Sequence, residues 1–300
     1  MARRRLTRQQ AQRIRAQQER RRERASTGDG AHASDAVLGP ERHGLIIAHY
    51  GASLQVEADD GGRFRCTARQ NLGALACGDQ VVWQQVADTE SGVVVALQPR
   101  ASVLARPDNA GRERPLAANV DRIMVVAAAF PELSEHLIDR YLVAAESTGI
   151  APVIVLNKVD LADREALQHL RQRLSVYERI GYSVLYTSVR TEHGLDPLKA
   201  ALGDHTSILV GQSGVGKSSL VQTLLPQHEI RIGELTDSQL GRHTTTTAEL
   251  YHLPSGGNLI DSPGVRDFAV WHMNPEKIVT GFREFAPLLG HCKFNDCRHR

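Results

Sequence analysis

The sequence has few cysteines and no long hydrophobic run. Its four cysteines are too few and too unevenly spaced for a disulfide framework, and they lie at Cys66, Cys77, Cys292 and Cys297. No apolar stretch approaches the length of a membrane-spanning helix. The N-terminus is charged but lacks the apolar segment of a secretory signal, and Glu19 and Glu23 argue against an Arg-rich transit peptide. We therefore expect a cytoplasmic protein that does not enter membranes.

Positive charge is concentrated at the N-terminus. Residues 1–24 contain ten Arg and two Glu, whereas the rest of the chain carries 26 basic and 32 acidic residues. Residues 1–40 have too few apolar side chains to form a core, so we predict a disordered basic arm and linker. The arm is either a solvated tail or a tether for nucleic acid, because clustered Arg releases counterions when it binds phosphate backbones.

Residues 41–110 contain short strand-like runs such as LIIAHY and DQVVWQQV, separated by turns such as DDGG and ESG. This spacing predicts a small antiparallel barrel or sandwich, and we expect an OB-type β-barrel with Cys66 and Cys77 in its core. In GRFRCTAR, Phe64, Cys66 and Ala68 alternate with polar and basic residues, which predicts one apolar and one cationic face. The cationic face is either a solvated surface or an RNA-facing one.

Residues 111–268 follow a different pattern. Compact apolar runs such as RIMVVAAAF and VIVLN alternate with helical stretches such as EHLIDRYLVAAEST. Buried strands that alternate with helices favour parallel pairing, so the pattern predicts a multidomain α/β protein in which this segment is a doubly wound domain.

The segment GQSGVGKSSL has the pattern of a phosphate-binding loop, G-x-x-x-x-G-K-S, between a strand and a helix. Its backbone N–H groups would surround phosphate oxygens, Lys217 would reach the β- and γ-phosphates, and the Ser218 hydroxyl would bind Mg²⁺. The residues predicted to bind nucleotide here are Gly211, Gln212, Ser213, Gly214, Val215, Gly216, Lys217, Ser218 and Ser219.

A guanine-reading loop is predicted at the end of the apolar strand VIVLN, in the tetrapeptide Asn157, Lys158, Val159 and Asp160. The Asp160 carboxylate can accept hydrogen bonds from both N1–H and the exocyclic amine of guanine, a pattern that adenine does not present. Ser188 lies where a loop that supports the base is expected. The nucleotide predicted by these two loops is GTP.

The third element is NLIDSPG, in which Asp261 is expected to hold Mg²⁺ through water and Gly264 to offer its N–H to the γ-phosphate. Between the phosphate loop and Asp261 lies GRHTTTT, where a metal-binding Thr is expected; among Thr244, Thr245 and Thr246 we choose Thr245. The base loop therefore precedes the phosphate loop, the reverse of the usual order. If a GTPase with the usual order is cut after the segment that corresponds to NLIDSPG and its original termini are joined, this order results without disturbing the sheet.

The chain resembles the circularly permuted, ribosome small-subunit-dependent GTPase A family over about residues 40–300. The motifs that carry this resemblance are RPLAANVDRI, VLNKVDL, GQSGVGKSSL, GRHTTTT, LIDSPGVRDF and CKFNDCRH. The resemblance implies an OB barrel, a permuted P-loop GTPase domain over 111–268 and a C-terminal helical zinc-binding domain over 269–300. It also implies a role in late maturation of the small ribosomal subunit.

The motifs also suggest a catalytic residue and a set of zinc ligands. Val265 stands where many GTPases have a water-orienting Gln, so we expect slow intrinsic hydrolysis, and the resemblance supports His243 as the catalytic residue. Cys292, Cys297 and His299 have a spacing that suits structural Zn²⁺. The family pattern continues to a fourth ligand, a Cys beyond the His, whereas this sequence stops at Arg300, so we expect the zinc site to be truncated and incomplete.

The resulting hypothesis is a GTP-hydrolysing, monomeric assembly factor that binds the small ribosomal subunit and its rRNA. One alternative is a nucleotide-gated RNA-binding module in which hydrolysis is incidental. Another is a P-loop ATPase acting on a metabolite, in which the NKVD tetrapeptide is coincidental.

Overall fold

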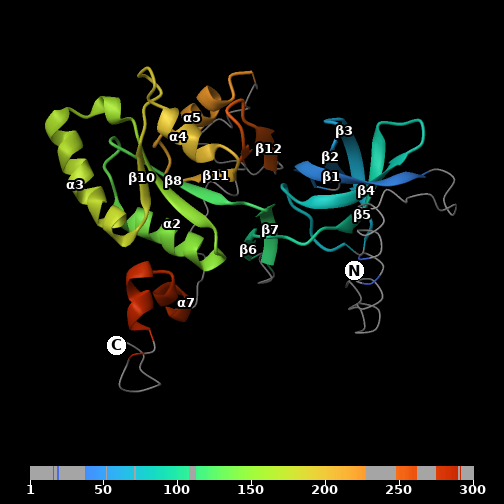
Figure 1. Ribbon diagram of the computed structural model, residues 1–300, viewed down its shortest axis with the longest axis horizontal. Helices are drawn as coiled ribbons and strands as arrows, with labels where there is room; N and C mark the ends of the chain where they lie inside the picture. Colours follow the sequence, from blue (N-terminus) through green and yellow to red (C-terminus); the bar gives the residue numbers. More distant parts are fainter. Residues whose placement is uncertain are drawn as a thin grey trace, which may run out of the picture. The chain divides into compact units, whose positions relative to one another are not determined.

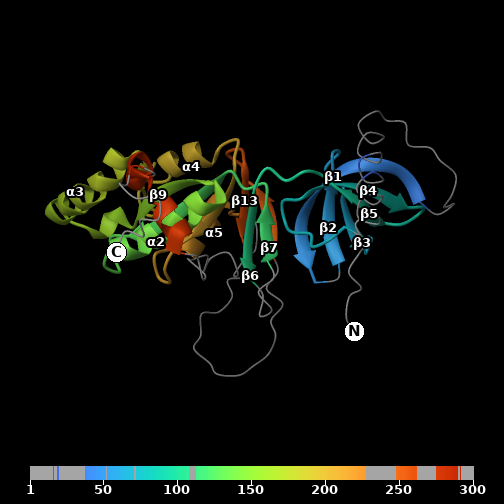
Figure 2. The same cartoon turned by 90° about the horizontal axis from the view of Figure 1, so that it is seen from below.

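The computed structural model describes residues 38–51, 53–70, 72–107, 113–227, 248–261, 275–289 and 291, together with the single residues 16 and 19. The chain divides into two compact units, Met1–Asn119 with His243–Leu250, and Val120–Arg242 with Tyr251–Arg300 (Figures 1 and 2). Most of the predicted basic arm lies outside the described residues.

The first unit is a closed five-stranded barrel, as predicted. Its strands pair in the order β1-β2-β3-β5-β4, and β4 also pairs with β1, which closes the sheet. Only β3 and β5 run parallel. The strands are β1 (Leu38–Tyr50), β2 (Ser53–Ala58), β3 (Arg63–Ala68), β4 (Gln80–Val86) and β5 (Ser91–Leu97).

The barrel core is built around Trp83, which is fully buried and lies 4.6 Å from Phe64 between ring centroids. Cys66 and Cys77 are both buried in this unit, as expected. Of the three residues predicted on the apolar face of β3, Cys66 is buried and Phe64 is partly buried, but Ala68 is exposed. Ala68 is the last residue of its strand, so the alternation ends there.

A hairpin made of β6 (Val103–Pro107) and β7 (Glu113–Ala118) belongs to the barrel unit. The Ala118 N–H donates to the Cys77 carbonyl at 2.9 Å, and Asn119 Nδ2 donates to the Gly78 carbonyl at 2.8 Å. These bonds attach residues after 110 to the barrel. The unit therefore extends to Asn119, nine residues beyond the domain end proposed from the sequence.

The second unit contains a parallel sheet with strand order β10-β9-β8-β11-β13, which confirms the predicted doubly wound fold. Helices α4 and α5 lie on one face of this sheet and α2 on the other (Figure 1). The strands are β8 (Arg122–Ala128), β9 (Ala151–Asn157), β10 (Ser183–Tyr186), β11 (Thr206–Val210) and β13 (Asn258–Asp261). The helices are α2 (Glu135–Thr148), α3 (Arg164–Ile180), α4 (Asp196–Leu202), α5 (Lys217–Leu224) and α7 (Pro275–Thr280), with 3₁₀ turns η1 (Val159–Leu161) and η2 (Arg283–Leu288).

Strand β12 (Ala248–His252) contributes to the first unit through its first residues. Ala248 and Glu249 pair antiparallel with His49 and Ala48 of β1.

Local sequence explains where the long helices begin and end. Asp163 precedes α3 and its carboxylate accepts the Ala166 N–H at 2.8 Å, which satisfies one of the free donors of the first turn. Gly149 and Gly181 follow α2 and α3 with φ of 70° and 99°, a conformation that glycine adopts without strain. Among the described residues, no helix is long and apolar enough to cross a membrane.

Candidate functional site

The predicted nucleotide-binding residues lie at the carboxyl ends of neighbouring parallel strands. The base loop follows β9, Ser188 follows β10, the phosphate loop follows β11, and Asp261 ends β13. Loops at the carboxyl ends of a parallel sheet meet at one edge, which is where ligands bind in open α/β folds.

The phosphate loop has a backbone that only glycine accommodates easily. Gly211, Gly214 and Gly216 have φ of 144°, 83° and 97°. A Cβ on Gly211 would collide with the Val126 carbonyl oxygen, and one on Gly216 would collide with Asn157 Nδ2. The glycines therefore allow this loop to pack directly against β8 and the base loop.

The Lys217 ammonium is bound by backbone carbonyls of the phosphate loop. Its Nζ lies 2.6 Å from the Gly211 carbonyl oxygen and 2.8 Å from the Gln212 carbonyl oxygen, and Lys217 is the first residue of α5. A cation at this position lies next to the N–H groups of the first helical turn, which carry partial positive charge. This arrangement suits the binding of phosphate oxygens.

The base loop is tied to the phosphate loop by two side chains. Asn157 is only 1% exposed; its Nδ2 donates to the Val215 carbonyl at 3.0 Å, and its Oδ1 accepts from Thr187 Oγ1 at 3.2 Å. Lys158 Nζ donates to the Gly214 carbonyl at 2.6 Å and to the Phe130 carbonyl at 3.1 Å. The two loops therefore form one hydrogen-bonded assembly, although about 58 residues separate their sequences.

The Asp160 carboxylate is oriented by Ser188. Ser188 Oγ donates to Asp160 Oδ1 at 2.5 Å and accepts the Arg190 N–H at 3.0 Å. The backbone supports the same loop, because the Val159 N–H donates to the Thr187 carbonyl at 3.2 Å. Ser188 thus fixes the carboxylate that the sequence assigns to guanine recognition.

Comparison with known proteins identifies the group to which this site belongs. A sequence model described as RsgA GTPase matches residues 97–271. The chain belongs to the RsgA GTPase family. A relative from Hahella chejuensis, named small ribosomal subunit biogenesis GTPase RsgA, is 49% identical over 310 residues, which cover 100% of this chain and 88% of the relative.

Two solved structures extend the likeness of this RsgA-family chain to the fold. YjeQ from Thermotoga maritima has a TM-score of 0.70 and 32% sequence identity, with 86% of this chain and 87% of that chain covered. YloQ, described as a circularly permuted GTPase, has a TM-score of 0.67 and 28% identity, with 90% and 86% covered. The permuted order predicted from the motifs is confirmed.

Several predicted residues of the RsgA-family site remain to be placed. Those that lie in the described phosphate loop and the first turn of α5 are Gln212, Ser213, Ser218 and Ser219. Asp261 is described and partly buried, and its strand pairs with β11, the strand that leads into the phosphate loop. The others lie outside the described residues and stay predictions: His243, Thr245, Gly264, Cys292, Cys297 and His299. Within the described parts of the chain, no cluster of three or more metal-ligating side chains is present.

Reasoning from the sequence missed two contributors to the site. Thr187 is a fully buried polar residue that directly follows β10 and donates to Asn157. Phe130 offers its carbonyl to Lys158, while its side chain is 69% exposed. Thr187 could have been found from its position beside Ser188 at a strand end. A backbone carbonyl acceptor leaves no signal in residue type, so Phe130 could not.

Proposed function

We propose that this chain hydrolyses GTP to GDP and phosphate, and that it acts in late maturation of the small ribosomal subunit, which stimulates the hydrolysis. The observation that best supports this proposal is the hydrogen-bonded assembly of base loop and phosphate loop. Asn157 and Lys158 hold Asp160 at a fixed position relative to Lys217. A single guanine nucleotide can therefore bind Asp160 through its base and Lys217 through its phosphates. The name of the Hahella chejuensis relative supports the biological role.

The phosphate end of the proposed site fits Mg²⁺. Ser218 is the second residue of α5, the helix that follows β11, and Asp261 ends β13, which pairs with β11. A hydroxyl and a carboxylate oxygen therefore come from the ends of two adjacent strands. Oxygen donors of this kind are what Mg²⁺ prefers, with phosphate oxygens completing the shell. When bound, Mg²⁺ would neutralise charge that develops on the transferring phosphoryl group.

The protein groups then have separate tasks. Lys217 binds the β- and γ-phosphates, and Asp160 selects guanine through N1–H and the exocyclic amine. We assign His243 to orienting or activating the attacking water, because Val265 has neither a donor nor an acceptor in its side chain. Thr245 and Gly264 are proposed to contact Mg²⁺ and the γ-phosphate. Zinc binding by Cys292, Cys297 and His299 is proposed for the C-terminal segment.

The proposed partner is the small ribosomal subunit with its rRNA, met by a monomeric, cytoplasmic protein. Arg63 and Arg65 are exposed on β3 of the barrel, and they are followed by the partly exposed Arg69. Together with the Arg-rich residues 1–24, they supply the positive charge that phosphate backbones attract.

The decisive experiment is steady-state hydrolysis by the purified chain, alone and with small ribosomal subunits. ATP and large subunits serve as controls for nucleotide and partner. We expect strong stimulation only with GTP and small subunits, and the His243→Ala variant should lose it. Equal stimulation by large subunits would contradict the proposed partner. An Asp160→Asn variant that keeps its preference for GTP over XTP would contradict the proposed base recognition.

A further inference from the structure

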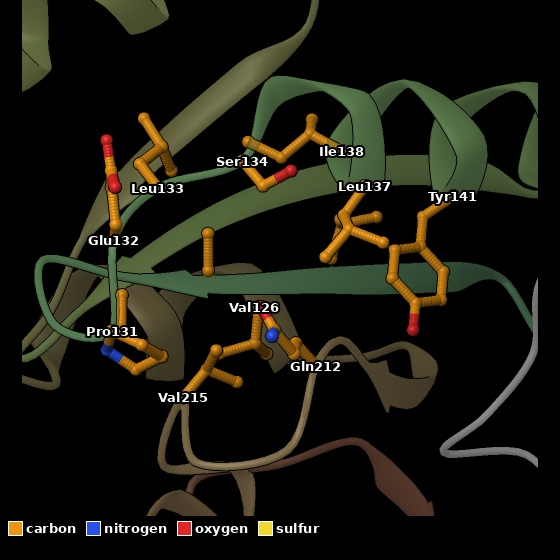
Figure 3. A pocket seen from close by; sticks show the side chains of 13 residues that line it. Val126, Pro131, Glu132, Leu133, Ser134, Leu137, Ile138, Tyr141, Gln212 and Val215 are labelled. Atoms are coloured by element: carbon orange, nitrogen blue, oxygen red, sulfur yellow. The ribbon is translucent and has the colours of Figure 1, made fainter.

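The N-terminal half of helix α2 and the phosphate loop line a common cavity. Between them lies a cavity of about 20 Å³, lined by Leu137 and Tyr141 of α2, by Val126 of β8, and by Gln212 and Val215 of the phosphate loop (Figure 3). A cavity of this size holds about one water molecule. The helix end is therefore not packed tightly against the loop, and a small shift of α2 has space to occur.

The other end of α2 is gripped by an arginine from the C-terminal segment, residues 275–289. Arg283 Nε lies 2.6 Å from Glu146 Oε1, and its Nη1 donates to the Gly181 carbonyl at 3.0 Å. The guanidinium also lies over the Tyr182 ring, 4.1 Å from its centroid. Burial, followed by the Glu146 charge, raises the pKa of Tyr182, so the ring stays neutral beneath the cation. We call these four residues the arginine clamp.

A second contact beside the arginine clamp brings the backbone of the segment against the helix. Gly281 is buried, and a Cβ at this position would lie 2.7 Å from Val143 Cγ1 and 3.1 Å from the Val143 carbonyl oxygen. Only a residue without a side chain permits this approach. The segment is thus seated on α2 by close packing at Gly281 and by directional charged bonds at Arg283.

We propose that α2 transmits binding at the C-terminal segment to the phosphate loop, and that Arg283 is the positioning residue that makes this transmission possible. Fourteen helical residues form a rod of about 21 Å, so a force on Glu146 is carried to Leu137 and Tyr141 beside the loop. A ribosomal partner that binds the C-terminal segment would shift α2 toward the cavity and restrict the motion of Gln212 and Val215. This inference rests on the proposed stimulation by small subunits.

The test compares basal and subunit-stimulated GTP hydrolysis in the intact chain. Arg283→Ala should leave basal hydrolysis within twofold of wild type and lower the stimulation factor at least about fivefold, the lower bound of typical coupling between sites. Arg140→Ala is the control, because it removes an exposed arginine from α2 itself and should leave the stimulation factor unchanged. Limited proteolysis should cut the C-terminal segment faster only in the Arg283 variant.

Charge reversal separates transmission from a purely structural role. Arg283→Glu and Glu146→Arg should each lose stimulation, and the double variant should recover at least part of it. Tyr182→Leu, which removes only the ring under the guanidinium, should give a smaller loss in the same direction and provides a milder variant if Arg283→Ala does not fold.

Four outcomes would overturn a proposal. Full stimulation of Arg283→Ala would overturn the transmission by α2 while leaving the proposed GTPase function intact. An equal loss in Arg140→Ala would reduce the effect to general charge and overturn it too. A parallel fall in basal and stimulated rates would show that the arginine clamp only stabilises the fold. Absence of stimulation in the wild-type chain would instead overturn the proposed function.

Discussion

The two units bury polar side chains for different purposes. In the barrel, Asp79 is fully buried, and its carboxylate accepts two bonds from Arg100, at 2.6 and 2.7 Å, and one from the Ala76 N–H at 2.8 Å. In the second unit, Asn157 and Ser188 are each 1% exposed and bond to loops at the sheet edge. The bonds of Asp79 tie together loop residues of the barrel unit, whereas those of Asn157 and Ser188 tie together the loops that carry the predicted nucleotide-binding residues.

The difference follows from the shape of each sheet. A closed barrel has no open strand edges. A buried carboxylate in it therefore acts mainly by attaching loops to the strands. An open parallel sheet ends in a row of loops at its carboxyl edge, and polar side chains there can both order the loops and face a ligand. Removing a buried polar group should therefore cost stability in the barrel and nucleotide binding in the second unit.

The largest expected effect is in the nucleotide site. Lys217→Ala removes the ammonium proposed to contact the β- and γ-phosphates, and we expect kcat/KM for GTP to fall about 1000-fold, as when a donor to a developing charge is lost. Thermal unfolding of the nucleotide-free chain should change little. Lys199→Ala, an exposed lysine on α4, is the control and should keep normal hydrolysis.

Asp79→Ala should have the converse effect. It leaves the Arg100 guanidinium without its carboxylate, and breaking a buried ion pair in this way lowers the free energy of unfolding by about 3 kcal/mol. Denaturant unfolding of the barrel measures the loss, while GDP affinity of the second unit should stay within twofold. Asp59→Ala at an exposed position is the control. A large fall in GDP affinity would contradict the division of roles between the units.

Asn157→Ala should have an intermediate effect that is visible mainly in nucleotide binding. It removes the amide that joins the Val215 carbonyl to Thr187, and loss of these bonds should weaken GDP binding about tenfold. Stopped-flow release of a fluorescent GDP analogue measures this change. Asn258→Ala removes an asparagine at the amino end of β13, away from the ligand edge, and should leave GDP release unchanged.

The smallest expected effect is a pH dependence of the barrel. Burial lowers the pKa of His49 below its ordinary value of 6.5, with a smaller lowering from Arg114, so the folded state favours the neutral ring. Its contribution to stability is complete above pH 6.5 and is lost as the pH falls through the lowered folded pKa. The melting temperature should therefore fall less between pH 7.5 and pH 5 for His49→Gln than for the wild type.

Local patterns in the sequence were enough to predict the main architecture. Alternating apolar residues and turn residues predicted the five-stranded barrel, and the apolar strands near Ile123, Ile154 and Ile208 predicted the parallel sheet. These predictions succeeded because strand burial and helix periodicity depend on neighbours within a few residues. The predicted apolar position of Ala68 was wrong, since strand ends are set by contacts that periodicity does not report.

The sequence by itself determined which chemical groups the protein brings to a nucleotide and in which order, because motif residues sit at fixed spacings after buried strands. Only the tertiary structure decided that Asn157 and Lys158 join the base loop to the phosphate loop. It alone decided that Arg283 meets Glu146, 137 residues earlier in the chain. Such contacts depend on how the whole chain folds back on itself, and many of their acceptors are backbone carbonyls that every residue type carries equally.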